Sequence, residues 1–76
     1  MSDRIVVDPR IQHGKPVIRG TRVPVSRIFG SLAGGMSKEA ILREYGITEE
    51  DLQAALAYGA ELIESEQFHP LPGQSA

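Results

Sequence analysis

The hydrophobic pattern divides the chain into an extended front third and a helical remainder. Residues 4–7, 17–19 and 22–25 are short β-prone runs, and turn signals containing Gly or Pro separate them. Pro16 and Pro24 lack a backbone N–H, so each belongs at a strand start or a sheet edge. We therefore expect a two- or three-stranded β element whose open edge pairs with a second copy of the chain.

From Val25 onward, the apolar positions follow the period of a helix. They fall on one face at spacings of three and four: Val25, Ile28, Phe29, Leu32, Ala33 and Met36. Ser26 is a candidate amino-terminal cap for this helix. Gly34 and Gly35 are expected to end it in the left-handed conformation that glycine tolerates.

Two more helices are expected after it. Ser37 caps a helix that reaches about residue 45 and stops at Gly46. Thr48 caps a third helix that reaches about residue 66, and acidic residues fill its first turn, where negative charge suits the helix dipole. An apolar stripe follows this third helix: Leu52, Ala55, Leu56, Gly59, Leu62 and Ile63.

Together these elements predict a single domain over residues 1–66, with a β segment (1–25) and three helices (26–66), followed by a flexible tail (67–76). The expected fold class is α+β, mostly α. A chain of 76 residues buries little surface alone, and small domains usually depend on disulfides, a metal or a partner subunit. Because the chain has no Cys, we expect a homodimer.

Composition argues against several other classes. The chain has no Cys, and its two His residues, His13 and His69, lie far apart, so we expect no metal and no cofactor. No nucleophile stands beside an evident base, so we expect no enzymatic activity. No apolar run approaches the roughly 18 residues of a membrane span, and the first residues lack a charged-then-apolar leader. We expect a cytoplasmic protein that does not contact the membrane.

Charge is distributed unevenly along the chain. Residues 1–45 hold all eight Lys and Arg against four acids, a formal charge of +4. Residues 46–76 hold six acids and no Lys or Arg, a formal charge of −6. Such asymmetry indicates a polyanion footprint on the basic part, although short chains also show it by chance.

The segment 14–22 concentrates cations, turn glycines and a hydroxyl. Exposed N–H groups at such turns, together with Arg side chains, favour an anion site, and paired strands can read DNA. The candidate DNA-binding residues are Arg4, Lys15, Arg19, Arg22 and Arg27. The structural alternative is that Gly20 and Thr21 only make the turn, while Arg19 or Arg22 pairs with Asp8 or with an acid of the other subunit.

The second and third helices are joined by a short turn that contains Gly, as in a helix-turn-helix. A recognition helix should offer cations or amides near its start. The third helix instead offers Glu49, Glu50 and Asp51, which repel phosphates, and Gln53 is the one plausible reader. We therefore do not expect the third helix to enter the major groove.

The acidic third helix has a second interpretation, as a ligand for a basic protein surface. Its apolar stripe would anchor it in a groove, and its carboxylates would orient it. The candidate partner-binding residues are Glu61, Leu62, Ile63, Glu64 and Phe68. The alternative is that the stripe packs on the chain's own helices or across the homodimer. That alternative is stronger for Leu52 and Leu56 than for Leu62 and Ile63.

Two strings carry a resemblance to a known family. The run from His13 to Val25 (HGKPVIRGTRVPV) and the run 33–37 (AGGMS), followed by Ile41, Leu42 and Tyr45, resemble the domain of unknown function 433 family over about residues 4–60. The resemblance implies a homeodomain-like helix-turn-helix protein with an amino-terminal β segment. It also implies an antitoxin of the VapB type, encoded beside a PIN-like ribonuclease toxin. It supplies no established binding residues to transfer.

The leading hypothesis is therefore an antitoxin of a type II toxin–antitoxin system. It would neutralise a PIN-like ribonuclease toxin and bind promoter DNA as a dimer. The rival hypothesis is a protein–protein interaction module that binds no DNA. In that case the segment 14–22, here called the signature segment, has only a structural role.

Overall fold

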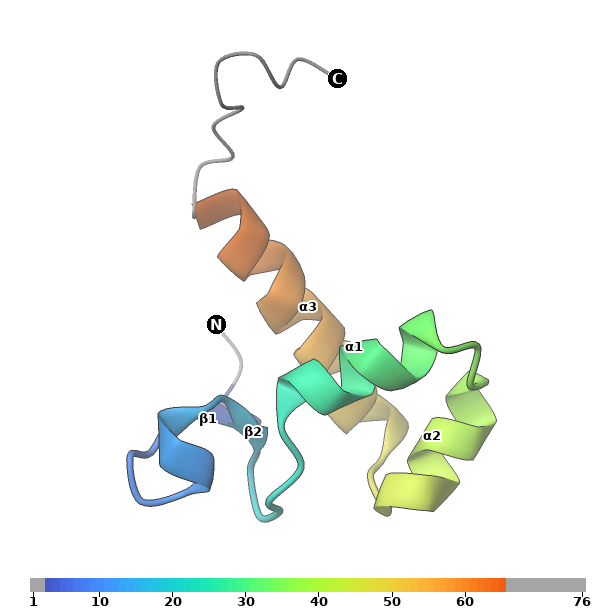
Figure 1. The fold of residues 1–76 in the computed structure, drawn as a ribbon, viewed down its shortest axis with the longest axis horizontal. Coiled ribbons are helices and arrows are strands. Elements are labelled where there is room, and N and C mark those ends of the chain that lie inside the picture. The colour runs from blue at the N-terminus through green and yellow to red at the C-terminus, as the bar shows by residue number, and fades with distance from the viewer. Residues whose placement is uncertain (1–2, 66–76) are drawn as a thin grey trace.

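The computed structural model describes residues 3–65, and within them the chain is mostly helical (Figure 1). In chain order its elements are β1 (Ile5–Val6), a 3-10 turn η1 (Gln12–Gly14), β2 (Val17–Ile18), α1 (Val25–Ala33), α2 (Lys38–Tyr45) and α3 (Glu49–Ser65). A two-strand amino-terminal segment followed by three helices over the described residues confirms the expected α+β, mostly α fold class.

The strands form a small antiparallel ladder. Ile5 pairs with Ile18, and Val6 pairs with Val17. The run 22–25 contributes only an isolated bridge, between Val17 and Pro24, so it is not a third strand. The physical reason is that Pro24 has no N–H to donate to a ladder, and α1 begins at the next residue.

The start of α1 differs from the expected one. Pro24 occupies the N-cap position with extended φ and ψ, and no side chain caps the helix. Ser26 lies inside the first turn and is exposed, so its predicted capping role is wrong. At the other end, Gly35 adopts the expected positive φ of +95°, whereas Gly34 has φ −80°.

The expected caps of α2 and α3 are confirmed. The Ser37 hydroxyl accepts the N–H of Ala40 at 3.1 Å, and Gly46 ends α2 with φ +64°. Thr48 and Asp51 cap α3 reciprocally: each side-chain oxygen accepts the backbone N–H of the other residue at 3.1 Å. This arrangement satisfies N–H groups that have no partner inside the helix.

The core lies where the helices and the ladder meet. Its fully buried large side chains come from β2, α1, α2 and the first half of α3: Val17, Ile18, Ile28, Ile41 and Leu52. Figure 1 shows α1 crossing α3, with the ladder near the start of α1 and α2 beyond its end. The second half of α3 extends past the other elements. The fold therefore buries one half of the longest helix and leaves the other half exposed.

Candidate functional site

Two of the five candidate DNA-binding cations are held by the chain itself. The Arg4 guanidinium lies 2.9 Å from Oδ1 of Asp51, which links the chain before β1 to the first turn of α3. Arg19 donates from Nε to the backbone carbonyl of Asp3. Both side chains therefore stabilise the packing of the front segment.

Gly20 and Thr21 of the signature segment stabilise the local fold as well. The Thr21 hydroxyl donates to the Ile18 carbonyl at 2.7 Å and accepts the Val23 N–H at 3.0 Å. Gly20 has φ +80°, a conformation that costs other residues energy. Gly20 and Thr21 therefore make the tight turn between β2 and α1.

A nearby pair of residues adopts an unexpected backbone conformation. Gln12 and His13 have φ of +50° and +58°, although neither is glycine. Their backbone forms η1, and the Lys15 N–H closes it on the Gln12 carbonyl. Such residues are uncommon in this region of φ and ψ, and nothing in the sequence indicated it.

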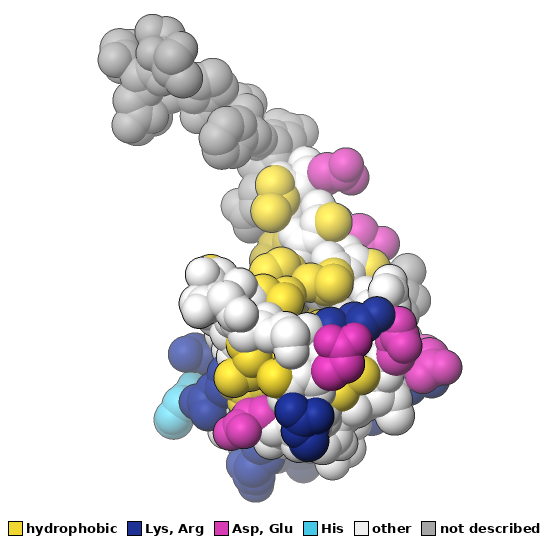
Figure 2. All heavy atoms as spheres, turned by 90° about the vertical axis from the view of Figure 1, so that its right-hand side faces the viewer, with side chains coloured by type: hydrophobic (Ala, Val, Ile, Leu, Met, Phe, Trp, Pro, Cys, Tyr) yellow, Lys and Arg dark blue, Asp and Glu magenta, His cyan; other side chains and the backbone are white. Residues whose placement is uncertain are grey.

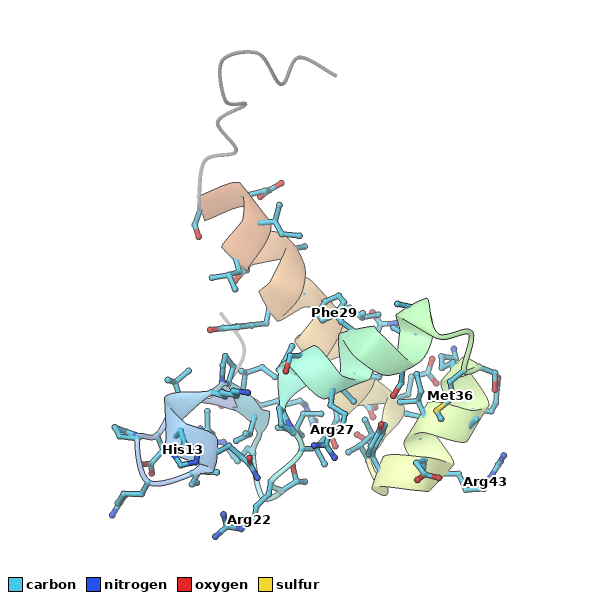
Figure 3. The ribbon with its side chains drawn as sticks, in the orientation of Figure 1. His13, Arg22, Arg27, Phe29, Met36 and Arg43 are labelled. Carbon is cyan, nitrogen blue, oxygen red and sulfur yellow. The ribbon has the colours of Figure 1, made fainter. Side chains whose placement is uncertain are left out.

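The other three candidate cations remain available. Lys15, Arg22 and Arg27 are exposed, and their side chains make no hydrogen bond or ion pair within residues 3–65. In Figure 3 the Arg22 side chain points away from the loop after β2, and Arg27 lies on the first turn of α1. These three side chains could meet phosphate oxygens without breaking a contact of the fold.

Asp8 does not pair with either arginine of the signature segment. It binds Arg10 instead, with Nη2 of Arg10 at 3.0 Å from Oδ2 of Asp8. The hydrogen bonds from Arg10 hold the pKa of the Asp8 carboxyl below its ordinary value. The alternative that Arg19 or Arg22 pairs with Asp8 is therefore not observed, because Arg10, two residues away, binds that carboxylate.

The acidic first turn of α3 is partly occupied by partners from other elements. Lys38 of α2 binds Glu49 at 2.9 Å, and this contact raises the pKa of Lys38. Burial acts to raise the pKa of Asp51, but the hydrogen bonds from Thr48 and Arg4 outweigh it and lower that pKa. Gln53 is exposed and lines an open hollow of about 480 Å³ with Arg4 and the glutamates of this turn.

The second candidate site is the second half of α3. Leu62 is 44% exposed and Ile63 is 64% exposed, so neither belongs to the buried core. Glu61 and Glu64 are exposed beside them. Figure 2 shows apolar and acidic side chains together on this projecting end. The fifth candidate residue, Phe68, lies outside the described residues.

A groove between α1 and α3 was not found from the sequence. It has a volume of about 220 Å³, and its lining is Pro16, Val25, Ser26, Phe29, Tyr58, Gly59 and Leu62. Phe29, which the sequence places in the apolar stripe of its helix, is 38% exposed here. A Cβ on Gly59 would overlap the Phe29 ring. The sequence signal for this close approach is Gly59 itself, because a glycine inside a helix costs about 1 kcal/mol relative to alanine.

Two further features bear on the chemistry that the site can perform. Among residues 3–65, no three His, Cys, Asp or Glu side chains lie together in a group that could hold a metal ion. None of the described helices is long and apolar enough to cross a membrane. The described residues present exposed cations on the front segment and an apolar and acidic surface at the end of α3.

Comparison with known proteins shows which family the chain belongs to. Residues 5–59 match the family described as "Protein of unknown function (DUF433)". The chain belongs to the DUF433 family. The matched span runs from β1 to Gly59 in α3, so it covers the ladder, the signature turn and the core. The resemblance seen in the sequence is confirmed at this level.

Two matches to the DUF433 chain come from Mycobacterium tuberculosis. A protein named "Putative antitoxin VapB45" is 38% identical over 52 residues, which are 68% of this chain and 22% of that protein. The crystal structure of Rv2018 matches 68% of this chain and 24% of its own chain, at 38% identity and a TM-score of 0.62. The DUF433 chain therefore corresponds to about a quarter or less of the length of each match.

Proposed function

We propose that this DUF433 chain is an antitoxin of a type II toxin–antitoxin system, which binds and neutralises a PIN-like ribonuclease toxin. The observation that carries the proposal is the second half of α3, where Leu62 and Ile63 are exposed between two glutamates. Apolar side chains that a helix leaves exposed can serve as anchors in a partner's groove. The name of the 38% identical relative from Mycobacterium tuberculosis supports the same function.

The charge of the chain supports a basic partner. Residues 46–76 carry six acids and no Lys or Arg. Complementary charge accelerates association and disfavours partners of the same sign. The acidic helix would therefore orient a basic surface of the toxin before the apolar anchors engage.

Coexpression tests this function directly. The chain is coexpressed with the product of the adjacent reading frame, and growth, complex formation and RNA cleavage are measured. We expect toxicity of the neighbour alone, rescue by the chain and a complex that survives gel filtration. The double change Glu61→Lys and Glu64→Lys should slow association, whereas Glu50→Lys on the opposite end of α3 should change it less. A neighbour that is toxic but neither binds nor is relieved would overturn the proposal.

Promoter binding is a second function that a separate observation favours. Lys15, Arg22 and Arg27 are exposed and lack a polar partner within the described part of the chain. As a homodimer, the chain would present two copies of this set, and each phosphate contact would release counterions. The first turn of α3 is acidic and holds Arg4 and Lys38, so DNA contact would come from the front segment.

Gel shifts on the chain's own promoter test this second function. Binding should tighten steeply as salt is lowered, and Arg22→Ala should reduce the salt slope by about one unit. Arg43→Ala, an exposed cation on α2, is the matched control. No shift at low salt would remove DNA binding and favour the rival interaction module.

Analytical ultracentrifugation at micromolar concentration tests the homodimer, and a stable single-chain species would contradict it.

A further inference from the structure

The groove between α1 and α3 is an apolar feature built from two elements and a turn. Its lining includes Phe29 of α1, Leu62 of α3 and Pro16, which precedes β2. Because Gly59 has no side chain, the Phe29 ring lies directly against α3. In Figure 3, Phe29 lies between α1 and α3.

The groove continues toward the acidic end of α3. A second hollow of about 220 Å³ is lined by Tyr58, Glu61, Leu62 and Ser65. Tyr58 and Leu62 line both hollows, so the hollow that Glu61 lines is adjacent to the groove. Ile63, although it is the more exposed of the two neighbours, lines neither hollow.

Charge decides what can cover this surface. A second copy that packed α3 against α3 would bring the same carboxylates, Glu61 and Glu64, against those already present, so like charges disfavour this symmetric contact. The chain's own residues 66–76 contain no Lys or Arg, so they offer no complement to the acidic rim. A partner protein that carries Lys or Arg beside an apolar side chain complements both parts of the surface.

We propose that the groove between α1 and α3 is a docking site for an apolar side chain flanked by Lys or Arg on a partner protein. The inference places Phe29, Gly59 and Leu62 in partner binding together, and it gives Ile63 a minor role. It deepens the proposed function, because the toxin would be the physiological partner. It goes beyond that function because α1 joins α3 in forming the interface.

A defined probe tests the groove without the toxin. The probe is a synthetic amphipathic peptide of leucine and lysine, and a peptide with glutamate in place of lysine is its control. The measurement is the change in backbone amide chemical shifts of the full chain on titration. We expect the lysine peptide to move the amides of residues 28–30 and 58–62 and the glutamate peptide to leave them unchanged. No response to the lysine peptide, or a response elsewhere on the chain, would overturn the proposal that the groove is a docking site.

Matched variants then compare neighbouring side chains on one helix. Leu62→Ala should weaken binding of the lysine peptide about tenfold, as loss of a central anchor does, and Phe29→Leu should weaken it several-fold. Ile63→Ala should change the affinity less than about twofold, because interface positions outside the central pocket contribute little. Circular dichroism melting curves confirm that each variant is folded. An Ile63→Ala effect equal to that of Leu62→Ala would overturn the proposal.

The same variants separate this inference from the proposed function. When the wild-type chain binds the product of the adjacent reading frame, Leu62→Ala and Phe29→Leu should release it faster than Ile63→Ala does. Binding that none of the three changes affects would refute the groove and leave the antitoxin function standing. Peptide binding in the groove without any binding of the neighbour would support the groove and refute the antitoxin function.

Discussion

The two halves of α3 share one apolar stripe and have different surroundings. In the first half, Leu52 and Ala55 are buried in the core, and Thr48 and Asp51 cap the helix start. In the second half, Leu62 and Ile63 follow the same apolar stripe and are exposed. The boundary lies near Gly59, the last buried residue of the helix.

The contrast shows that an apolar stripe alone does not say what it packs against. The first half of α3 faces α1 and β1, which supply a buried surface for it. The second half extends past both, as Figure 1 shows. A helical stripe longer than the elements that cover it leaves apolar side chains for a partner, and this excess is what the proposed function uses.

Truncation of one leucine in each half tests this contrast most strongly. Leu52→Ala should lower the free energy of unfolding by about 2–5 kcal/mol, because it leaves a cavity in the core. Leu62→Ala should change it by less than about 0.5 kcal/mol, because Leu62 is already half exposed. Urea denaturation of both variants measures the difference. A large loss for Leu62→Ala would place the second half of α3 in the core.

The boundary itself can be tested at Gly59. Gly59→Ala should lower the free energy of unfolding by about 1–3 kcal/mol, because the new methyl group overpacks against the Phe29 ring. In a Phe29→Ala background, the same change should raise it by about 1 kcal/mol, because alanine is the better helix former. A double-mutant cycle measures the coupling. Equal effects of Gly59→Ala in both backgrounds would mean that the two residues do not touch.

The capped start of α3 predicts a smaller effect with a pH dependence. Thr48→Ala should lower the free energy of unfolding by about 1 kcal/mol, the usual value for a lost cap. Since the pKa of Asp51 is lower when folded than when unfolded, its contribution is complete above the unfolded value of about 3.9 and is lost as pH falls through the folded value. Asp51→Asn should therefore destabilise the chain at pH 7 and become nearly neutral at low pH. Melting curves between pH 7 and pH 2 would show a constant difference if Asp51 were not involved.

The smallest expected effect is at the surface contact between α2 and α3. Lys38→Gln removes the ion pair with Glu49, and both side chains are about half exposed. Exposed pairs contribute little, and salt screens them. The melting midpoint should shift within experimental error at physiological salt. A clear loss that high salt does not reduce would show that this contact has a packing role.

Local signals were sufficient for most of the fold. The caps at Ser37 and Thr48 and the stop at Gly46 depend on neighbours within a few residues, so their sequence positions predicted them correctly. Ser26 failed as a cap because Pro24, two residues earlier, occupies the N-cap position and α1 begins at Val25. The family signature also follows from local order, and the match over residues 5–59 confirms it.

The candidate sites were only partly predictable. The sequence named five cations as equivalent, but the structure ties Arg4 to Asp51 and Arg19 to the Asp3 carbonyl. These contacts join residues that are 47 and 16 positions apart, and no local pattern encodes such a distance. The exposure of Leu62 was expected, whereas the part that Phe29 plays beside it was not.

By itself, the sequence determined the order of the helices, the caps of α2 and α3, the charge of each half of the chain and the family. These properties depend on residue types and on short spacings, which survive in any arrangement of the chain. Only the tertiary structure decided which cations are already engaged, where the core ends along α3 and that a groove opens between α1 and α3. Those properties depend on which surfaces meet when distant segments pack, and that is a property of the folded chain as a whole.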